Sequence, residues 1–202
     1  MKRNFKNKNK WKDIYTDLAR KLGYPARSVF KLKEINEIYK IIKKGDKVLD
    51  LGASPGSWSL YALKIVGKKG RVVAIDLNDL EIVFPENLEF IKFDILNDEI
   101  FSKIKENFNV VLSDLAPLTS GILDLDKENS LILAKRAFEI AKNKLKDKGN
   151  FVCKIFESEK INSFLKEIKR YFNFVKRYRP KATRKRSSEI YIIAKEFQKI
   201  NL

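Results

Sequence analysis

The sequence contains no histidine and only one cysteine among its 202 residues. The absence of histidine excludes His–carboxylate catalysis and His-ligated metal sites, so any general base has to be Lys, Asp, Glu or Tyr. The single cysteine, Cys153, cannot form a disulfide within the chain, which fits a reducing compartment. We therefore expect chemistry that requires neither a metal ion nor a disulfide framework.

Long apolar runs are also missing. No stretch approaches the roughly 20 apolar residues that span a bilayer, and no apolar segment follows the basic N-terminus as it would in a secretory signal. Hydrophobic residues still make up 44% of the chain, enough to bury a core. We expect a single domain over residues 13–202 after a basic tail over residues 1–12. We also expect a monomer without a membrane partner, in the cytoplasm or an organelle.

Acidic residues are few relative to basic ones: 26 Asp and Glu stand against 43 Lys and Arg, a formal net charge of +17. Residues 1–12 hold six basic residues and residues 176–186 hold seven, and neither segment holds an acid. A general drift towards lysine would spread the excess, whereas a binding surface concentrates it. The distribution predicts a polyanionic partner, of which nucleic acid is the usual one. The candidate RNA-binding residues are Lys6, Lys8, Lys10, Lys12, Arg27, Arg179, Lys181, Arg184 and Arg186.

Hydrophobic periodicity predicts strands that alternate with helices. Strands are expected at 47–51, 71–76, 88–93, 109–113, 150–156, 173–179 and 188–195, and helices at 13–22, 27–40, 57–66, 98–106, 127–146 and 159–171, with a further short helix before the third strand. This alternation predicts an α/β fold whose mostly parallel sheet is covered on both faces. The last two strands are joined by a basic segment without a helical pattern, which predicts an antiparallel pair at one edge.

The segment Asp50-Leu-Gly-Ala-Ser-Pro-Gly-Ser-Trp58 joins the first predicted strand to a helix. Small residues let the backbone approach a ligand, and the helix start offers free N–H groups. The spacing matches neither G-x-G-x-x-G nor the P-loop, which disfavours a dinucleotide or a triphosphate. Asp76 ends the second predicted strand, where an acid can accept hydrogen bonds from the ribose hydroxyls of an adenosine. Asp94 ends the third and could meet an adenine amino group. A tight turn that binds nothing is the alternative for the loop taken alone.

Four charged residues are candidates for catalysis. Lys154 lies inside an otherwise apolar strand, where a buried ammonium costs energy unless it is paired or loses its proton. Asp114 ends the fourth predicted strand, Lys31 lies on a helix before the sheet, and Glu189 begins the last strand. A lysine that reaches solvent from the strand end is the alternative for Lys154. A solvated surface is the alternative for Lys31 and Glu189.

Together these segments resemble the FtsJ-type RNA 2′-O-methyltransferases over residues 13–196. The motifs that carry the resemblance are Arg27-Ser-x-x-x-Lys-Leu32, Asp50-Leu-Gly-Ala-Ser-Pro-Gly-Ser-Trp58, Ser113-Asp-Leu-Ala-Pro117, Cys153-Lys-Ile-Phe156 and Arg186-Ser-Ser-Glu-Ile-Tyr191. The resemblance implies a Rossmann-like methyltransferase fold, with a seven-stranded sheet whose last strand is antiparallel. It also implies S-adenosyl-L-methionine as cofactor and ribosomal RNA or the large ribosomal subunit as partner, with a uridine as the target.

The resemblance also assigns site residues. The implied catalytic tetrad is Lys31, Asp114, Lys154 and Glu189. The candidate cofactor-binding residues are Gly52, Ala53, Pro55, Gly56, Trp58, Asp76, Asp94 and Asp114. A neutral Lys154 would take the proton of the ribose 2′-hydroxyl, whereas a charged Lys154 would orient that hydroxyl or stabilise developing negative charge. Burial and Lys31 favour the neutral form, Asp114 and Glu189 favour the charged one, and the sequence leaves both open.

Two positions depart from the family pattern. The loop reads Ser54-Pro-Gly-Ser57 where the family usually has a small residue and then Pro-Gly-Gly, and the usual polar continuation after Pro117 becomes Leu118-Thr-Ser-Gly121. The second departure leaves the RNA-facing details open. A tRNA anticodon-loop 2′-O-methyltransferase is an alternative that shares the implied fold and tetrad. A non-catalytic ribosome-assembly factor is disfavoured by the intact tetrad, and a dehydrogenase by the missing G-x-G-x-x-G.

Overall fold

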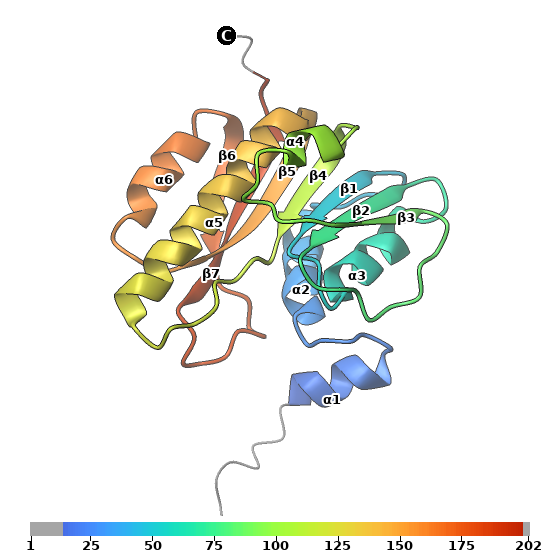
Figure 1. The fold of residues 1–202 in the computed structure, drawn as a ribbon, viewed down its shortest axis with the longest axis horizontal. Helices are drawn as coiled ribbons and strands as arrows, with labels where there is room; N and C mark the ends of the chain where they lie inside the picture. The colour runs from blue at the N-terminus through green and yellow to red at the C-terminus, as the bar shows by residue number, and fades with distance from the viewer. Residues whose placement is uncertain (1–13, 200–202) are drawn as a thin grey trace, which may run out of the picture.

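The computed structural model describes residues 14–199, which form a seven-stranded sheet with helices on both faces (Figure 1). The strands are β1 (Lys47–Leu51), β2 (Arg71–Asp76), β3 (Leu88–Lys92), β4 (Phe108–Ser113), β5 (Leu145–Phe156), β6 (Phe172–Tyr178) and β7 (Glu189–Phe197). The helices are α1 (Ile14–Lys21), α2 (Val29–Tyr39), α3 (Ser57–Val66), α4 (Ile100–Lys103), α5 (Leu123–Lys144) and α6 (Ile161–Ile168). The expected α/β class is therefore confirmed.

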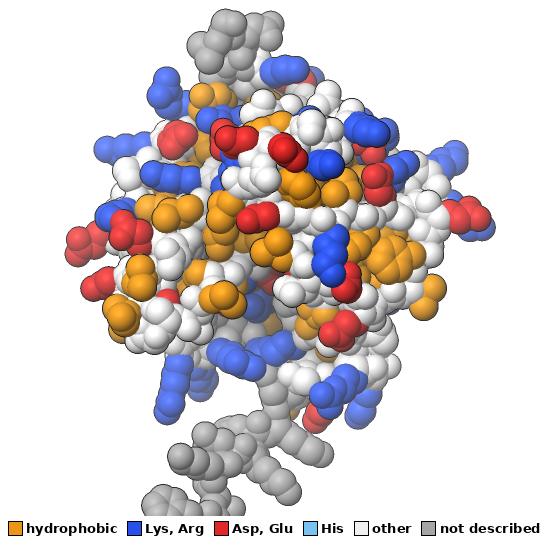
Figure 2. Space-filling model, viewed as in Figure 1, with side chains coloured by type: hydrophobic (Ala, Val, Ile, Leu, Met, Phe, Trp, Pro, Cys, Tyr) orange, Lys and Arg blue, Asp and Glu red, His pale blue; other side chains and the backbone are white. Residues whose placement is uncertain are grey.

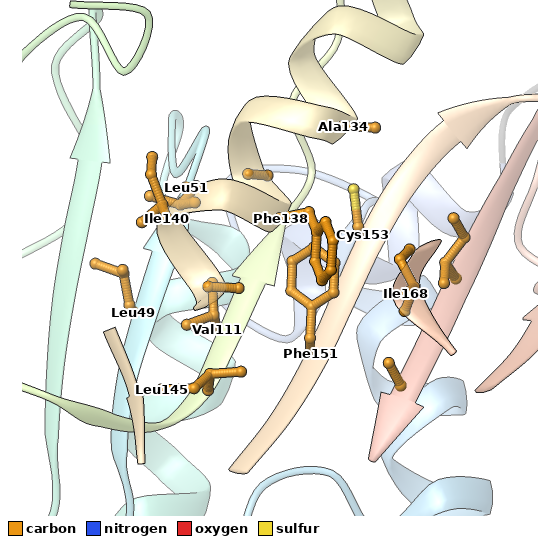
Figure 3. Close-up of a cluster of buried hydrophobic side chains, with 14 of the residues drawn as sticks. Leu49, Leu51, Val111, Ala134, Phe138, Ile140, Leu145, Phe151, Cys153 and Ile168 are labelled. Atoms are coloured by element: carbon orange, nitrogen blue, oxygen red, sulfur yellow. The ribbon is translucent and has the colours of Figure 1, made fainter. Parts of the chain in front are cut away.

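Alternation along the strands builds two cores, one on each face of the sheet, because successive side chains of a strand point to opposite faces. On one face Leu49 and Leu51 of β1 join a cluster in which Phe138 of α5 lies over Phe151 of β5 (Figure 3), with ring centroids 6.0 Å apart. On the other face Val48 of β1 joins a cluster built with α2 and α3. The helices thus pack against the sheet from both sides.

The sheet order is β3-β2-β1-β4-β5-β7-β6, and β7 is the strand that runs against its neighbours. The antiparallel pairing of the last two strands is confirmed, with β6 at the edge and β7 inserted between β5 and β6. This insertion places Lys154 of β5 directly opposite Tyr191 and Phe156 opposite Glu189. The start of β7 therefore lies beside the carboxyl end of β5.

Several element boundaries differ from the sequence prediction. The short helix expected just before β3 is absent, because the described segment 77–87 between β2 and β3 forms bends and turns. At its end the Asn87 side-chain amide donates to the carbonyls of Gly67 and Gly70. The helix expected over 98–106 is the single turn α4, and the one expected over 159–171 is α6, which ends at Ile168. Helix α5 begins at Leu123, earlier than expected. The sequence did not predict this start, because the apolar residues of the first turn are exposed and form no core-facing pattern.

Strand β5 starts at Leu145, directly after α5, and not at the expected residue 150. Leu145 is buried and pairs with Phe108, after which the register shifts before Val110 pairs with Asn150. Because a short polar stretch separates the two pairs, apolar periodicity alone did not predict that the strand begins at Leu145. Across residues 14–199, helices that combine the length and the apolar character needed to cross a membrane are absent.

Candidate active site

A cavity of about 540 Å³ opens beyond the carboxyl ends of β1, β2 and β4. This is the edge at which open α/β sheets bind their ligands. The lining combines acidic and apolar side chains, and it includes Gly52, Asp76, Asp94 and Asp114 from the sequence prediction. Residues that the sequence prediction missed also line it: Ser54, Ile75, Leu77, Asn78, Phe93, Ile95, Leu96, Leu115, Ala116, Leu118 and Leu133.

The loop after β1 is shaped by a glycine and by Asp76. Gly52 has φ +75°, and a Cβ there would lie 2.9 Å from the Leu115 side chain, so this position requires glycine twice over. The Asp76 carboxylate accepts hydrogen bonds from the backbone N–H groups of Ser54, at 3.0 Å, and Asn78, at 2.8 Å. Asp76 therefore fixes the loop against the end of β2 and holds its carboxylate at the cavity.

Four residues of the predicted cofactor set are not among the described residues that line the cavity. Within residues 14–199 the cavity lining does not include Ala53, Pro55, Gly56 or Trp58. Trp58 is 2% exposed, its indole N–H donates to the Ser28 carbonyl at 2.9 Å, and its ring lies 5.8 Å from that of Tyr191. The structure thus places Trp58 as a packing residue between α2, α3 and β7. Asp94 is partly buried, and its carboxylate accepts the Leu96 N–H at 2.9 Å.

Lys154 and Asp114 form the centre of the site. The Lys154 side chain is 7% exposed, and its Nζ lies 3.1 Å from Asp114 Oδ1 and donates to the Asp114 carbonyl at 2.7 Å. Lys154 comes from the carboxyl-terminal part of β5, and Asp114 directly follows β4, the neighbouring parallel strand. Of the options that the sequence left open for Lys154, the structure shows a buried lysine whose Nζ lies beside an acidic partner, and not one that reaches solvent.

Lys31 and Glu189 form a second ion pair, with 2.5 Å between Lys31 Nζ and Glu189 Oε1. Both side chains are 12% exposed, so the solvated-surface alternative for these two residues is wrong. Lys31 projects from α2, and Glu189 begins β7 opposite Phe156 at the end of β5. The four charged residues of the predicted tetrad therefore meet at one end of the sheet as two opposite-charge pairs.

Tyr191 connects the two pairs, and it was not among the predicted site residues. Its hydroxyl donates to Asp114 Oδ1 at 2.8 Å, and Lys31 Nζ lies 6.0 Å from its ring centroid. Burial and the neighbouring Asp114 and Glu189 raise the pKa of Tyr191 well above its ordinary value, so the phenol keeps its proton and remains a donor. The period of two along β7, which places residues 189 and 191 on one face, was the signal available in the sequence.

Asp50 is another polar residue near the site to which the sequence analysis assigned no role. It is fully buried, and its Oδ2 accepts the Ser59 hydroxyl at 2.6 Å. Burial, together with the nearby Asp114 and Asp76, raises the pKa of Asp50 to about 7. Cys153, also buried, has its pKa raised by burial to about 12, so the thiol stays protonated and is a poor nucleophile.

A second cavity of about 450 Å³ adjoins the tetrad, and basic residues of α2's N-terminal approach and of the loop before β7 line it. Its lining includes Lys31 and Glu189 together with Arg27, Arg184 and Arg186. We call it the basic cavity. The Arg27 guanidinium donates to the Ala182 carbonyl, which ties the two basic segments together.

The remaining predicted RNA-binding residues have different positions. Arg179 donates to the Ser187 carbonyl at 2.6 Å and so closes the loop before β7, although its side chain is exposed. Lys181 is exposed, and its backbone N–H donates to Glu34 at 2.9 Å. Lys6, Lys8, Lys10 and Lys12, like the predicted tail over residues 1–12, lie outside the described residues. Within residues 14–199, no group of three or more His, Cys, Asp or Glu side chains could hold a metal ion.

The model of the FtsJ-like methyltransferase family matches residues 24–197. The chain belongs to this family. The ribosomal RNA large subunit methyltransferase E of Desulfatibacillum aliphaticivorans is 47% identical to it over 96% of this chain and 94% of that protein. The protein of the same name from Archaeoglobus fulgidus is 45% identical over 93% of this chain and 97% of that protein. The resemblance drawn from the motifs is therefore confirmed.

Solved structures agree with this membership in the FtsJ-like family. A Plasmodium falciparum crystal structure named as a ribosomal RNA methyltransferase matches with a TM-score of 0.76 and 25% identity, over 86% of this chain and 98% of that one. Aeropyrum pernix fibrillarin, solved with S-adenosyl-L-methionine bound, matches with a TM-score of 0.56 and 18% identity, over 83% and 73%. The second likeness is one of fold alone. The fold and the methyltransferase class of this FtsJ-like chain are thus established.

Proposed function

We propose that this FtsJ-like methyltransferase transfers a methyl group from S-adenosyl-L-methionine to a ribose 2′-hydroxyl of large-subunit ribosomal RNA, with a uridine as the target nucleotide. The observation that carries the proposal is the buried Lys154 Nζ, which lies 3.1 Å from the carboxylate of Asp114, a residue that lines the cavity beyond β1, β2 and β4. We further propose that the protein acts as a monomer in the cytoplasm.

The cavity beyond β1, β2 and β4 fits the proposed cofactor in size and in the chemistry of its lining. Its volume of about 540 Å³ falls within the range of roughly 300–1,000 Å³ that small-molecule sites occupy. Asp76 would accept hydrogen bonds from ribose hydroxyls, Asp94 would accept one from the adenine amino group, and Phe93 and Leu115 would pack against the base. Gly52 would let the backbone approach the ligand. Bound there, the cofactor would supply an electrophilic methyl group.

Lys154 is the proposed general base. Its Nζ, without its extra proton, would take the proton of the 2′-hydroxyl, so that the hydroxyl oxygen can accept the methyl group as the methyl–sulfur bond of the bound sulfonium breaks and leaves a neutral thioether. Asp114 holds Nζ through both its carboxylate and its carbonyl, and Tyr191 holds the Asp114 carboxylate. The Lys31–Glu189 pair would place the ribose against Lys154, because both residues also line the basic cavity. A base held in position contributes about 10²–10⁴ in rate.

The proposed RNA partner follows from charge and from the relatives. The net charge is +17, and Arg27, Arg184 and Arg186 converge on a cavity beside the tetrad, where they would bind phosphates. Several relatives that match most of this chain are named ribosomal RNA large subunit methyltransferase E. A polyanion drawn to the basic cavity would bring a ribose to the tetrad.

The test measures transfer of labelled methyl from S-adenosyl-L-methionine to large ribosomal subunits, naked ribosomal RNA and tRNA. We expect a ribosomal substrate to be labelled at one 2′-hydroxyl, and Lys154→Ala to lose at least about 10² of the rate. Labelling of tRNA alone would replace the proposal with anticodon-loop methylation. Tight RNA binding without any transfer would replace it with an assembly role.

Lys144→Ala is the matched control for the removal of a lysine. The Lys144 Nζ donates to the carbonyls of Phe101, at 2.9 Å, and Ile104, at 2.5 Å, and Lys144 directly precedes the start of β5, whereas Lys154 lies near the end of that strand. This variant should lose stability and keep its rate at saturating substrate, whereas Lys154→Ala should fold and lose the rate. Equal losses of rate in the two variants would contradict the assignment of Lys154 as the base.

A further inference from the structure

Residues 115–123 lead from β4 to the first residue of α5, and they expose three large apolar side chains near each other in sequence. Leu118 is 96% exposed, Leu123 72% and Ile122 63%. Figure 2 shows hydrophobic side chains gathered at the lower left, over the N-terminal end of α5. We call these three residues the apolar ledge. Side chains this exposed add nothing to the core, and a patch of them beside a functional site is typical of a contact surface.

The ledge is held in shape by hydrogen bonds at its base. Buried Asp126 accepts hydrogen bonds from the Ser120 backbone N–H, at 2.7 Å, and from the Ser120 hydroxyl, at 2.8 Å. The Ser120 Oγ in turn accepts the Ile122 N–H at 3.1 Å. These bonds from Ser120 lower the pKa of Asp126, which keeps the carboxylate ionised and the turn closed. The loop is therefore built to present its apolar side chains outward.

The position of the ledge relates it to the reacting centre. Three members of the tetrad line the two cavities: Lys31 and Glu189 line the basic cavity, and Asp114, together with Leu118, lines the cavity beyond β1, β2 and β4, which we call the cofactor cavity after its proposed ligand. The ledge follows Asp114 in the chain, and residues 115–123 contain no charged residue. A nucleotide with its 2′-hydroxyl at Lys154 would therefore have the cations of the basic cavity on the side of Lys31 and the apolar Leu118 on the side of Asp114.

We propose that the apolar ledge receives the base of the target nucleotide, unstacked from its neighbours; this inference rests on the proposed function. Phosphates are drawn to the basic cavity, so the uncharged base is the part of the nucleotide that the ledge suits. Proteins that read RNA in sequence commonly take unstacked bases onto their side chains, most often aromatic ones. The apolar face of a base can also pack on aliphatic side chains, which bury it from water without choosing between bases. Holding the base there fixes the ribose, which turns its 2′-hydroxyl towards Lys154.

The test compares a natural target with an abasic one. The RNA that the wild type methylates, free or within a reconstituted particle, is prepared with the target nucleotide intact or lacking its base and retaining the 2′-hydroxyl. Leu118→Ala and Ile122→Ala should each lower kcat/KM about tenfold on the intact target. On the abasic target, the wild type should fall to the level of the variants, and the variants should lose nothing further.

Ile132→Ala is the matched control, because Ile132 is a half-exposed apolar residue farther along α5 that lines neither cavity. It should match the wild type on both targets. Ile122 does not line the cofactor cavity, so its variant should also keep the wild-type affinity for S-adenosyl-L-methionine. Unchanged kcat/KM in both ledge variants, or an equal loss on intact and abasic RNA, would overturn the ledge alone. Failure of the wild type to methylate any ribosomal substrate would instead overturn the proposed function, and the ledge with it.

Discussion

Arg136 of α5 supports the proposed cofactor cavity without lining it. Its Nε donates to the Ile95 carbonyl at 2.6 Å and its Nη2 to the Asn97 carbonyl at 3.1 Å. The stretch that carries these carbonyls also supplies Phe93, Asp94, Ile95 and Leu96 to the cavity lining. The substitution Arg136→Met keeps an apolar stem over the Phe101 ring, from which the guanidinium lies 5.0 Å, and removes every donor. It should therefore loosen the wall of the cavity.

The loss of free energy of unfolding caused by Arg136→Met follows from the groups that the guanidinium contacts. The carboxylates of Asp98 and Glu139 are 93% and 49% exposed, so these two ion pairs contribute between about 0 and 1 kcal/mol together. Hydrogen bonds from a charged donor contribute about 1.5–3 kcal/mol each. Ile95 is buried and would lose its bond in full, whereas Asn97 is exposed and would regain one from water. We expect a loss of about 2–3 kcal/mol in the free energy of unfolding.

Urea denaturation and titration with S-adenosyl-L-methionine check this prediction. The affinity for the cofactor should fall about threefold to tenfold, because in the variant the cavity wall adopts its binding-competent conformation less often. Arg71→Met is the control: Arg71 is 47% exposed, forms ion pairs with Glu89 and Glu106, and should cost less than about 1 kcal/mol. Equal losses of stability in the two variants, or a destabilised Arg136→Met with unchanged cofactor affinity, would refute the reasoning.

Three further predictions concern the site itself. Tyr191→Phe removes the donor to Asp114 and should lower kcat about tenfold while cofactor affinity stays unchanged, as single-turnover kinetics and titration would measure; a wild-type rate would contradict the role of this hydroxyl. The pKa of Asp50 is raised to about 7 from an ordinary value near 3.9. Between these two pH values the folded chain keeps a proton on Asp50 that the unfolded chain releases. The contribution of Asp50 to the free energy of unfolding therefore falls as the pH rises through that window. Asp50→Asn should therefore gain about 2–3 kcal/mol relative to the wild type between pH 5 and 7 in urea denaturation, and a constant difference would exclude the shift. Replacing Arg184 and Arg186 by Ala should reduce the salt dependence of RNA binding by about one phosphate contact for each residue, and an unchanged slope would remove both from the interface.

The sequence alone determined the class of fold and the family. The strand periodicity is local, because an apolar run flanked by turns reads as a buried strand whatever it pairs with. The motifs around residues 31, 114, 154 and 189 pointed to the four charged residues that the structure brings together. A lysine inside an apolar strand indicated a buried group that has to be paired or lose its proton. Asp76 and Asp94 could be placed at the cavity because acids that end parallel strands lie along one edge.

Only the tertiary structure decided how these residues are paired. Strand β7 pairs with β5 across more than 30 residues of chain, and no local propensity encodes the register that sets Tyr191 opposite Lys154 and Glu189 opposite Phe156. The same holds for Trp58, for which the family resemblance implied a cofactor contact, whereas its burial against Tyr191 depends on α2, α3 and β7 together. The raised pKa of Asp50 likewise arises from burial and from two carboxylates distant in sequence. Local sequence fixes which side chains a strand presents to a face, whereas the packing of distant elements fixes what those side chains meet.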